Sequence, residues 1–284
     1  MKVESPAQQL FFSTVRIEGD VVGTPPKTSV GTAFCFLYQK NGKEMPFLVT
    51  NKHVVKDTTS SRLIFTKSGP NPNPAPLLGQ RIDVTATSQT GLHWHGHPSP
   101  DIDVAVMPIL SMIQQAEQAG NPLYIKALPD SFIPTPEQVD ELDALEEILF
   151  IGYPNGLYDQ TNLTPIARKG TTATPLQLDY NGKPMFLIDA SVFEGSSGSP
   201  VFILNDGVYT IRGKGFTFGM RCYLLGVLSS VLGSMAFNPL QVINTSQIPG
   251  IVTTQRLNLG CVYKTSSILE TVLDFVTKFN ISFD

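Results

Sequence analysis

Residues 47–55 read Phe-Leu-Val-Thr-Asn-Lys-His-Val-Val, an apolar run that ends in a polar turn bearing one histidine. Residues 101–106, Asp-Ile-Asp-Val-Ala-Val, place carboxylates at the opening of a second apolar run. Residues 195–200, Gly-Ser-Ser-Gly-Ser-Pro, form a turn of small residues that opens a third. Because short apolar runs bounded by turn residues are typical of strands, these segments predict a histidine, an aspartate and a serine at strand ends.

The same pattern of short strands and turns extends over the whole chain of 284 residues. Only 15% of the residues are charged, against about 25% in typical soluble domains, and there are 23 glycines and 22 prolines. This composition disfavours coiled coils, helical repeats and disordered scaffolds. The spacing of short strands and turns favours a β-sandwich or β-barrels over a parallel βαβ fold. Examples of the strand-like runs are Ser13–Ile17, Thr32–Tyr38, Phe47–Thr50, Arg62–Phe65, Val104–Ile109, Ile148–Tyr153, Met185–Ala190, Pro200–Leu204 and Tyr223–Ser229.

Turn and helix signals divide this β-rich chain. Thr135-Pro136-Glu137-Gln138 is a capping box with Pro at the first helical position. The acidic segment 137–147 is the best linker candidate between two β-rich halves. Ser267 and Glu270 predict the start of a C-terminal helix, with an apolar face at Leu269, Val272, Val276 and Phe279. The strongest hairpin signals are Asn41-Gly42, Asn181-Gly182 and Asp206-Gly207.

A histidine, an aspartate and a serine have a chemical reason to occur together. A serine hydroxyl is a poor nucleophile at neutral pH and needs a base within hydrogen-bond reach. Histidine can be that base, and a buried carboxylate fixes its tautomer, while glycines let backbone N–H groups approach a reacting carbonyl. Each segment also has an ordinary interpretation as a surface histidine, a solvated aspartate or a simple turn, but their joint occurrence favours catalysis.

At these residues the sequence resembles the chymotrypsin-fold serine proteases, nearest to the bacterial glutamyl endopeptidase and Deg-type branch. Residues 48–55 are similar to the histidine motif of that branch, residues 103–106 to its Asp-Ile-Ala-Val, and residues 195–202 to its Gly-Asn-Ser-Gly-Ser-Pro-Val-Phe. Residues 150–154 and 224–230 also fit, the latter resembling the strand that lines the specificity pocket. Together these segments make the resemblance cover nearly the whole chain.

The resemblance implies an all-β fold of two antiparallel six-stranded Greek-key β-barrels with a C-terminal helix. Residues 1–130 are then the barrel that carries the histidine and the aspartate, and residues 131–147 are a linker with a short helix. Residues 148–284 are the barrel that carries the serine, followed by the helix. Deg-type relatives usually add a PDZ domain, for which we expect no room after the second barrel.

Carried over residue by residue, the resemblance implies Ser197 as the nucleophile, His53 as the general base and acid, and Asp103 as the carboxylate that orients the histidine. Asp101 would share a strand face with Asp103, but Asp103 stands directly before the apolar run and is preferred. The oxyanion hole is expected at Gly195, Ser196 and Ser197, mainly from the N–H groups of the first and the last.

One position of the resemblance concerns activation. Ser196 stands where pancreatic-type enzymes carry an aspartate that pairs with a newly cut N-terminus, and no Ile-Val-Gly-Gly start is present. We therefore expect no activation by N-terminal insertion. The turn around the serine must then be ordered by a partner, by substrate or from the outset.

The implied specificity pocket lacks the groups that select charged substrate residues. Ser191 replaces the aspartate of trypsin-like pockets, while Val192 and Leu228 replace a threonine and a histidine of glutamyl endopeptidases. Val231 stands where many relatives have glycine and would narrow the pocket. We expect small or medium apolar residues before the scissile bond. The implied substrate-binding residues are Ser191, Val192, Glu194, Leu228, Ser229, Ser230 and Val231.

Other features argue against cofactors and several classes of partner. A net charge of −4 disfavours nucleic-acid binding, and without a signal peptide or a run of about 18 apolar residues we expect a cytoplasmic chain with no membrane partner. Alternation of His93, His95 and His97 could place three imidazoles on one strand face for zinc, but no fourth ligand is evident, so we predict no metal and no cofactor. Cys35, Cys222 and Cys261 lack a CxxC pair and are expected to be buried free thiols.

The favoured hypothesis is a serine endopeptidase that cleaves polypeptide substrates through an acyl-enzyme. One alternative is a latent processing or defence protease that needs an activating protein partner to shape its pocket. The other is a non-catalytic protein-binding module on the same fold. Labelling of the serine by a fluorophosphonate distinguishes a competent enzyme from both alternatives.

Overall fold

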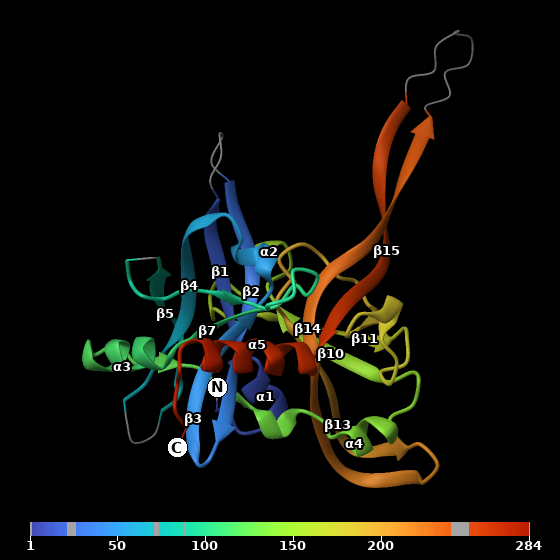
Figure 1. Ribbon diagram of the computed structural model, residues 1–284, viewed down its shortest axis with the longest axis horizontal. Helices are drawn as coiled ribbons and strands as arrows, with labels where there is room; N and C mark the ends of the chain where they lie inside the picture. The colour runs from blue at the N-terminus through green and yellow to red at the C-terminus, as the bar shows by residue number, and fades with distance from the viewer. Residues whose placement is uncertain (1, 22–26, 71–73, 88, 240–249, 284) are drawn as a thin grey trace.

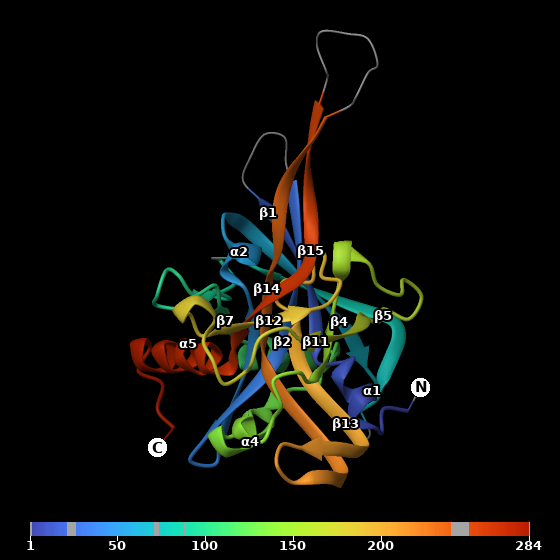
Figure 2. The same cartoon turned by 90° about the vertical axis from the view of Figure 1, so that its right-hand side faces the viewer.

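The computed structural model describes residues 2–21, 27–70, 74–87, 89–239 and 250–283; the side chains of residues 27, 230–239 and 250–256 lie outside this description. Within these ranges the chain forms two β-sheets, short connecting helices and a C-terminal helix (Figure 1). The two sheets lie beside each other, and a long two-stranded ribbon extends away from the second one (Figure 2). The expected all-β fold with a C-terminal helix is confirmed.

The first half forms a nine-stranded sheet rather than a six-stranded barrel. Its main path is β5-β4-β1-β2-β3-β7-β6, which has two ends within the described ranges, while β8 pairs with β4 and β9 pairs with β2. The count exceeds six because three two-residue strands, β6, β8 and β9, pair onto longer ones. The strands are β1 (Thr14–Val21), β2 (Lys27–Lys40), β3 (Lys43–Thr50), β4 (Thr58–Ser68), β5 (Pro76–Ala86), β6 (His95–Gly96), β7 (Ala105–Pro108), β8 (Leu123–Tyr124) and β9 (Leu128–Pro129).

The second half closes into the six-stranded antiparallel barrel that the resemblance implies. Its order is β10-β11-β12-β15-β14-β13, and β13 returns to pair with β10. The strands are β10 (Glu147–Gly152), β11 (Ile166–Thr172), β12 (Met185–Asp189), β13 (Pro200–Ile211), β14 (Gly215–Pro239) and β15 (Gly250–Lys264).

Only one of the three hairpin signals forms the expected turn. Asn41 and Gly42 connect β2 to β3 with φ values of 52° and 76°, as a tight hairpin turn requires. Asn181-Gly182 lies in a 3₁₀ turn before β12, whose strand partners are β11 and β15. Asp206-Gly207 continues within β13, where Gly207 lies opposite Gly219, so the hairpin instead turns at residues 212–214.

The C-terminal helix begins earlier than the sequence indicates. Lys264 occupies the N-cap position, so Ser267 is buried in the first turn instead of capping the helix. The buried face is centred on Ile268, Val272 and Phe275, whereas Phe279 is 55% exposed. The helices are α1 (Pro6–Leu10), α2 (Lys52–Val55), α3 (Leu110–Gln118), α4 (Pro136–Asp140), which has the predicted capping box, α5 (Thr265–Lys278), η1 (Asp130–Phe132), η2 (Pro154–Gly156) and η3 (Tyr180–Gly182).

The core joins the two halves beneath α5. One apolar cluster belongs to the first sheet, one to the barrel, and a third contains side chains of both halves together with α5. Phe275 of α5 packs edge-on against Phe47 of β3, with ring centroids 5.6 Å apart. Because α5 follows the barrel in the chain but packs on the first sheet, it holds the two halves together. Among the described residues, no helix is long and apolar enough to cross a membrane.

Candidate active site

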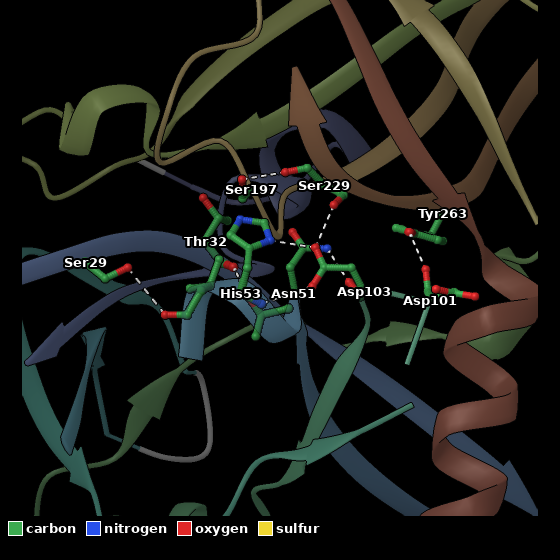
Figure 3. A network of polar contacts seen from close by, with 11 residues as sticks. Ser29, Thr32, Asn51, His53, Asp101, Asp103, Ser197, Ser229 and Tyr263 are labelled. Atoms are coloured by element: carbon green, nitrogen blue, oxygen red, sulfur yellow. Dashed lines mark hydrogen bonds and ion pairs between the residues drawn. The ribbon is translucent and has the colours of Figure 1, made fainter. Parts of the chain in front are cut away.

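His53 and Asp103 meet because neighbouring strands run antiparallel. Thr50 at the end of β3 lies opposite Ala105 at the start of β7, so residues just after β3 face residues just before β7. His53 lies in α2, directly after β3, and Asp103 lies just before β7. Asp103 Oδ2 is 2.6 Å from His53 Nδ1, and Asp103 Oδ1 accepts a hydrogen bond of 3.0 Å from the His53 backbone N–H (Figure 3).

The Asp103 carboxylate is held in its ionised form. Ser229 Oγ donates a hydrogen bond of 2.7 Å to Asp103 Oδ2. Burial raises the pKa of Asp103, but the hydrogen bonds from His53 and Ser229 outweigh burial and lower its pKa below the ordinary carboxyl value. An ionised carboxylate only accepts hydrogen bonds. In the neutral imidazole of His53, the proton therefore resides on Nδ1, and Nε2 keeps a free lone pair that can accept a proton.

Asp101, the second carboxylate of this segment, has a different environment. It is exposed, and its backbone carbonyl accepts a hydrogen bond of 3.0 Å from the Tyr263 hydroxyl. Asn51, which precedes α2, donates from Nδ2 to the Asp103 carbonyl at 2.7 Å. The structure therefore pairs His53 with Asp103, and Asn51 and Tyr263 fix the backbone on either side.

Ser197 reaches the site from the second half, in the serine turn (residues 193–199) between β12 and β13. In the view of Figure 3, the His53 ring lies between Ser197 and the Asp103 carboxylate. The Ser197 hydroxyl donates to the Ser229 carbonyl at 2.6 Å, and among the described residues no hydrogen bond joins it to His53. Catalytic hydrogen bonds in unliganded enzymes are often misaligned, and rotation about the Ser197 Cα–Cβ bond would redirect the hydroxyl.

Two backbone N–H groups of the serine turn remain available for an oxyanion. The N–H groups of Gly195 and Ser197 have no acceptor within the described part of the chain. The carbonyls of the same two peptide units are held on the opposite side, Glu194 O by the Asn155 N–H at 2.5 Å and Ser196 O by the Ser199 N–H at 3.0 Å. Since the C=O and N–H of a trans peptide point in opposite directions, both free N–H groups point away from these anchors.

Ser196 differs from the expectation that all three residues contribute to the oxyanion hole. Its N–H donates to the Phe193 carbonyl at 3.1 Å, which closes the serine turn internally. Its hydroxyl oxygen is buried and has no hydrogen-bond partner among the described residues. Ser196 therefore shapes the turn but does not offer its N–H to a ligand.

The serine turn requires glycine at two positions. Gly195 and Gly198 have φ values of +81° and +87°, in the left-handed region that favours glycine. A Cβ on Gly195 would lie 2.4 Å from the Tyr153 carbonyl oxygen, and a Cβ on Gly198 would lie 1.8 Å from the Thr32 carbonyl oxygen. The turn thus packs directly on backbone from η2 and from β2, with no space for a side chain.

The expected pocket residues have different environments. Ser191 and Glu194 are exposed, and Ser229 lies in the hydrogen-bond network of Asp103. Ser230 and Val231 pair with Cys261 and Gly260 through the backbone of β14, and their side chains lie outside the described residues.

Val192 and Leu228 are buried together in the barrel core. A Cβ built on Gly260 would lie 2.9 Å from Val192 Cγ2 and 3.1 Å from Leu228 Cδ1, so both side chains converge on this glycine. Cys35 and Cys261 are buried free thiols, and Cys222 is a half-buried one. Burial raises the pKa of Cys35 to about 12 and that of Cys222 to about 11, which makes both unsuitable as nucleophiles.

Two of the alternating histidines are engaged by α5. His95 Nε2 is 2.6 Å from Asp274 Oδ2, and His97 Nε2 is 3.1 Å from Glu270 Oε2, while His93 is exposed. Within the described residues, no group of three or more His, Cys, Asp or Glu side chains could hold a metal ion. These histidine–carboxylate pairs attach α5 to the segment that leads to Asp103.

Thr32 is a site residue that the sequence did not single out. It lies on β2, is fully buried, and contacts the serine turn from the first half of the chain. A polar residue inside an apolar strand usually has hydrogen-bond partners when it is buried. That rule is the signal that could have marked Thr32, although it does not say which partners the residue has.

Comparison with known families assigns the chain to a class. Residues 31–209, more than half of the chain, match the family described as the trypsin-like peptidase domain. This range includes His53, Asp103 and Ser197. The chain therefore belongs to the trypsin-like peptidase family, which confirms the resemblance to chymotrypsin-fold serine proteases. The nearer resemblance to the glutamyl endopeptidase and Deg-type branch stays a prediction.

Comparison with individual proteins shows only distant similarity. No curated protein sequence matches the chain. Among solved structures, a protease from M. tuberculosis in its active form has 14% identity and a TM-score of 0.45, covering 96% of this chain and 87% of that one. A thermostable serine protease from an extremophilic microorganism has 13% identity and a TM-score of 0.45, with coverage of 96% and 100%. An inactivated protease paralogue of the scabies mite has 13% identity and a TM-score of 0.47, with coverage of 95% and 98%.

Proposed function

We propose that the protein is a serine endopeptidase in which Ser197 is the nucleophile, His53 the general base and acid, and Asp103 the carboxylate that orients His53. The observation that carries this proposal is the contact of 2.6 Å between His53 Nδ1 and Asp103 Oδ2. This contact leaves Nε2 unprotonated in the neutral ring, and in Figure 3 the ring lies between Asp103 and Ser197. The substrate is a polypeptide, and no cofactor takes part.

Acylation begins when the substrate carbonyl oxygen accepts hydrogen bonds from the Gly195 and Ser197 N–H groups. Ser197 Oγ forms a bond to the carbonyl carbon, its proton moves to His53 Nε2, and the carbonyl π electrons move to the oxygen. Asp103 stabilises the resulting imidazolium. The C–N bond then breaks, and the departing amine takes the proton from His53, which leaves an ester on Ser197.

Deacylation repeats these steps with water as the nucleophile. His53 accepts a proton from the water as its oxygen bonds to the ester carbon. When the bond between that carbon and Ser197 Oγ breaks, the oxygen recovers a proton from His53. The carboxylic acid product leaves, and the enzyme returns to its starting state.

Labelling by a fluorophosphonate tests the proposal without knowledge of the substrate. Ser197 Oγ displaces fluoride from phosphorus and becomes covalently modified, so we expect the wild-type chain to be labelled with 1:1 stoichiometry between pH 6 and 9. Ser197→Ala lacks the nucleophile and should not react, and mass spectrometry locates the adduct. Ser199→Ala is the matched control, because Ser199 lies in the same turn and its buried hydroxyl has no hydrogen-bond partner among the residues that the structure describes. Absence of labelling in the wild type would contradict the proposal.

A latent form is the second candidate, because Ser197 Oγ donates to the Ser229 carbonyl instead of to His53. In that case an activating partner would redirect the hydroxyl. The same labelling experiment separates the two candidates, since a latent enzyme reacts only when a partner is added. The non-catalytic module has no specific observation in its favour.

We also propose that the residue before the scissile bond is a small or medium apolar one. The support for this preference is the convergence of Val192 and Leu228 on Gly260, which fills space at the predicted pocket. A side chain of the size of valine at this position makes the predicted pocket too shallow for a long substrate side chain. The preference is therefore governed by shape, because neither Val192 nor Leu228 carries a charge that could attract a charged side chain.

Cleavage profiling with a peptide library tests this preference. Val192→Ala removes two methyl groups from the filled space, so we expect kcat/KM for leucine or phenylalanine before the scissile bond to rise about tenfold or more relative to alanine. Val201→Ala is the matched control, because Val201 is buried in the same apolar cluster. The control should lose stability without a change of preference. An unchanged profile for Val192→Ala would refute the assignment of this pocket.

A further inference from the structure

The serine turn takes the place of a strand beside β2. Strand β2 lies between β1 and β3, and its pairing with β3 extends only as far as Phe34, opposite Val49. At Thr32 the neighbouring position is occupied by the serine turn, and the Thr32 N–H donates to the Ser197 carbonyl at 2.9 Å. The nucleophile-bearing backbone of the second half is thus hydrogen-bonded to the edge of a strand in the first half.

The Thr32 side chain links the two segments that surround the Gly195 N–H. Its Oγ1 donates to the Gly195 carbonyl at 2.9 Å and accepts a hydrogen bond of 3.1 Å from the Tyr153 N–H. The Tyr153 segment continues into η2, where the Asn155 N–H holds the Glu194 carbonyl. One hydroxyl therefore restrains the peptide unit after Gly195 and the segment that holds the peptide unit before it.

The position of Thr32 is itself restrained. Thr32 is fully buried, and its carbonyl accepts a hydrogen bond of 2.6 Å from Thr50 Oγ1. With the bonds to Ser197, Gly195 and Tyr153, this makes four hydrogen bonds at Thr32 within the described residues. The close approach of Gly198 to the Thr32 carbonyl leaves no space between the strand and the serine turn. Because the hydroxyl has no access to water, it depends on Gly195 and Tyr153 as its hydrogen-bond partners.

The turn's own hydroxyl next to Gly195 does not play this role. The Ser196 hydroxyl, at the position after Gly195, is buried without a partner in the described residues, so it fastens the turn to no other segment. We infer that Thr32 is a positioning residue that keeps the serine turn in its oxyanion-binding form in the chain as it stands, without cleavage or an activating partner. This inference rests on the proposed function and specifies how its oxyanion hole is ordered.

Three variants test the inference. Thr32→Val keeps the shape of the side chain but removes the hydroxyl, which leaves the Gly195 carbonyl and the Tyr153 N–H unsatisfied. Thr32→Ser restores the hydroxyl. Thr172→Val is the matched control, because Thr172 is also fully buried and its Oγ1 likewise donates to a carbonyl, Ala144 O, and accepts from an N–H, that of Glu146, both at 2.9 Å.

The first measurement is the second-order rate constant for fluorophosphonate labelling, at a temperature where all variants are folded. Loss of one oxyanion-hole donor typically slows reaction by about 10²–10³-fold, and Thr32 acts on the donor through its position. We therefore expect Thr32→Val to react about 10²-fold more slowly than Thr172→Val, and Thr32→Ser to react within about threefold of the wild type. The pH dependence of the rate should keep its shape, because the His53–Asp103 pair is not altered.

The second measurement is amide hydrogen exchange of the peptide covering residues 193–199, which does not depend on activity. Thr32→Val should increase exchange there and at residues 153–156, whereas Thr172→Val and Thr32→Ser should not. Equal labelling rates for Thr32→Val and Thr172→Val would overturn the inference while the proposed function stands. If the wild type is not labelled, the proposed function fails, and exchange alone decides: unchanged exchange in Thr32→Val overturns the inference, and increased exchange supports it.

Discussion

His53→Ala lowers the rate of peptide hydrolysis by about 10⁴-fold or more, if His53 is the proton acceptor for Ser197. Without the imidazole, the Ser197 hydroxyl has no base, and the departing amine has no acid to protonate it. The measurement is kcat/KM on the best peptide from library profiling, with the fluorophosphonate labelling rate as a second readout. Residual activity should come from the oxyanion hole and from substrate binding alone.

Two further variants make this test specific. His93→Ala is the control for replacement of a histidine, because His93 is exposed, and it should keep activity within about twofold. The double variant of His53→Ala with Ser197→Ala should be no slower than the slower single variant, because residues that act as one unit have non-additive effects. Activity of His53→Ala within tenfold of the wild type would remove His53 from its proposed role.

Gly198→Ala is expected to lower both the stability and the activity of the protein strongly. The new Cβ would lie 1.8 Å from the Thr32 carbonyl oxygen and 2.5 Å from Thr50 Oγ1, at a backbone φ of +87°. Because the nearest atom belongs to buried backbone, the serine turn must move away from β2. We expect a loss of about 3 kcal/mol in the free energy of unfolding and of about 10³-fold in kcat/KM, since both oxyanion donors are displaced.

Gly182→Ala separates the effect of crowding from the effect of backbone strain. Gly182 has a φ of +70°, but a Cβ there would meet no atom of the described residues within 4 Å. It should cost about 1 kcal/mol and leave activity unchanged. Urea unfolding and kcat/KM are measured for both variants. A Gly198→Ala protein with the stability and activity of Gly182→Ala would show that the serine turn does not need its contact with β2.

The strands were predictable to the extent that their signals are local. All nine apolar runs identified in the sequence lie on strands of the structure, because alternation of apolar and polar residues and the turn residues between them act over a few positions. Strands β5, β11 and β15 contain none of these runs; the sequence of β11, Ile-Ala-Arg-Lys-Gly-Thr-Thr, is mostly polar and its burial is partial. The number of strands in the first sheet was also missed, because two-residue strands exist only through their partners.

Hairpin and helix boundaries failed where a distant contact outweighed a local preference. The Asp206-Gly207 pair has the composition of a turn, yet β13 continues through it because Gly207 lies opposite Gly219 in an extended ladder. Ser267 has the side chain of a helix cap, yet α5 starts at Thr265 and buries Ser267 against the core. In both cases tertiary packing decided the position of the element's end.

The candidate site was predictable in its residue types but not in its contacts. The structure brings His53 and Asp103 together because β3 and β7 are paired, and the motifs themselves mark both residues. The direction of the Ser197 hydroxyl toward Ser229 depends on a strand 32 residues further along the chain. No motif near Ser197 encodes that contact. The catalytic roles of all three residues stay predictions, and the variants above test those of His53 and Ser197.

By itself the sequence determined the class of fold and the chemical groups of the candidate site. The sequence could determine them because strand, turn and nucleophile motifs consist of neighbouring residues, as in the segments 47–55 and 195–200. Only the tertiary structure decided how the serine turn is held, because the Thr32 hydroxyl and the Gly195 carbonyl are 163 residues apart along the chain. A buried hydroxyl must find its partners wherever the fold places them, and that placement is a property of the packed chain as a whole.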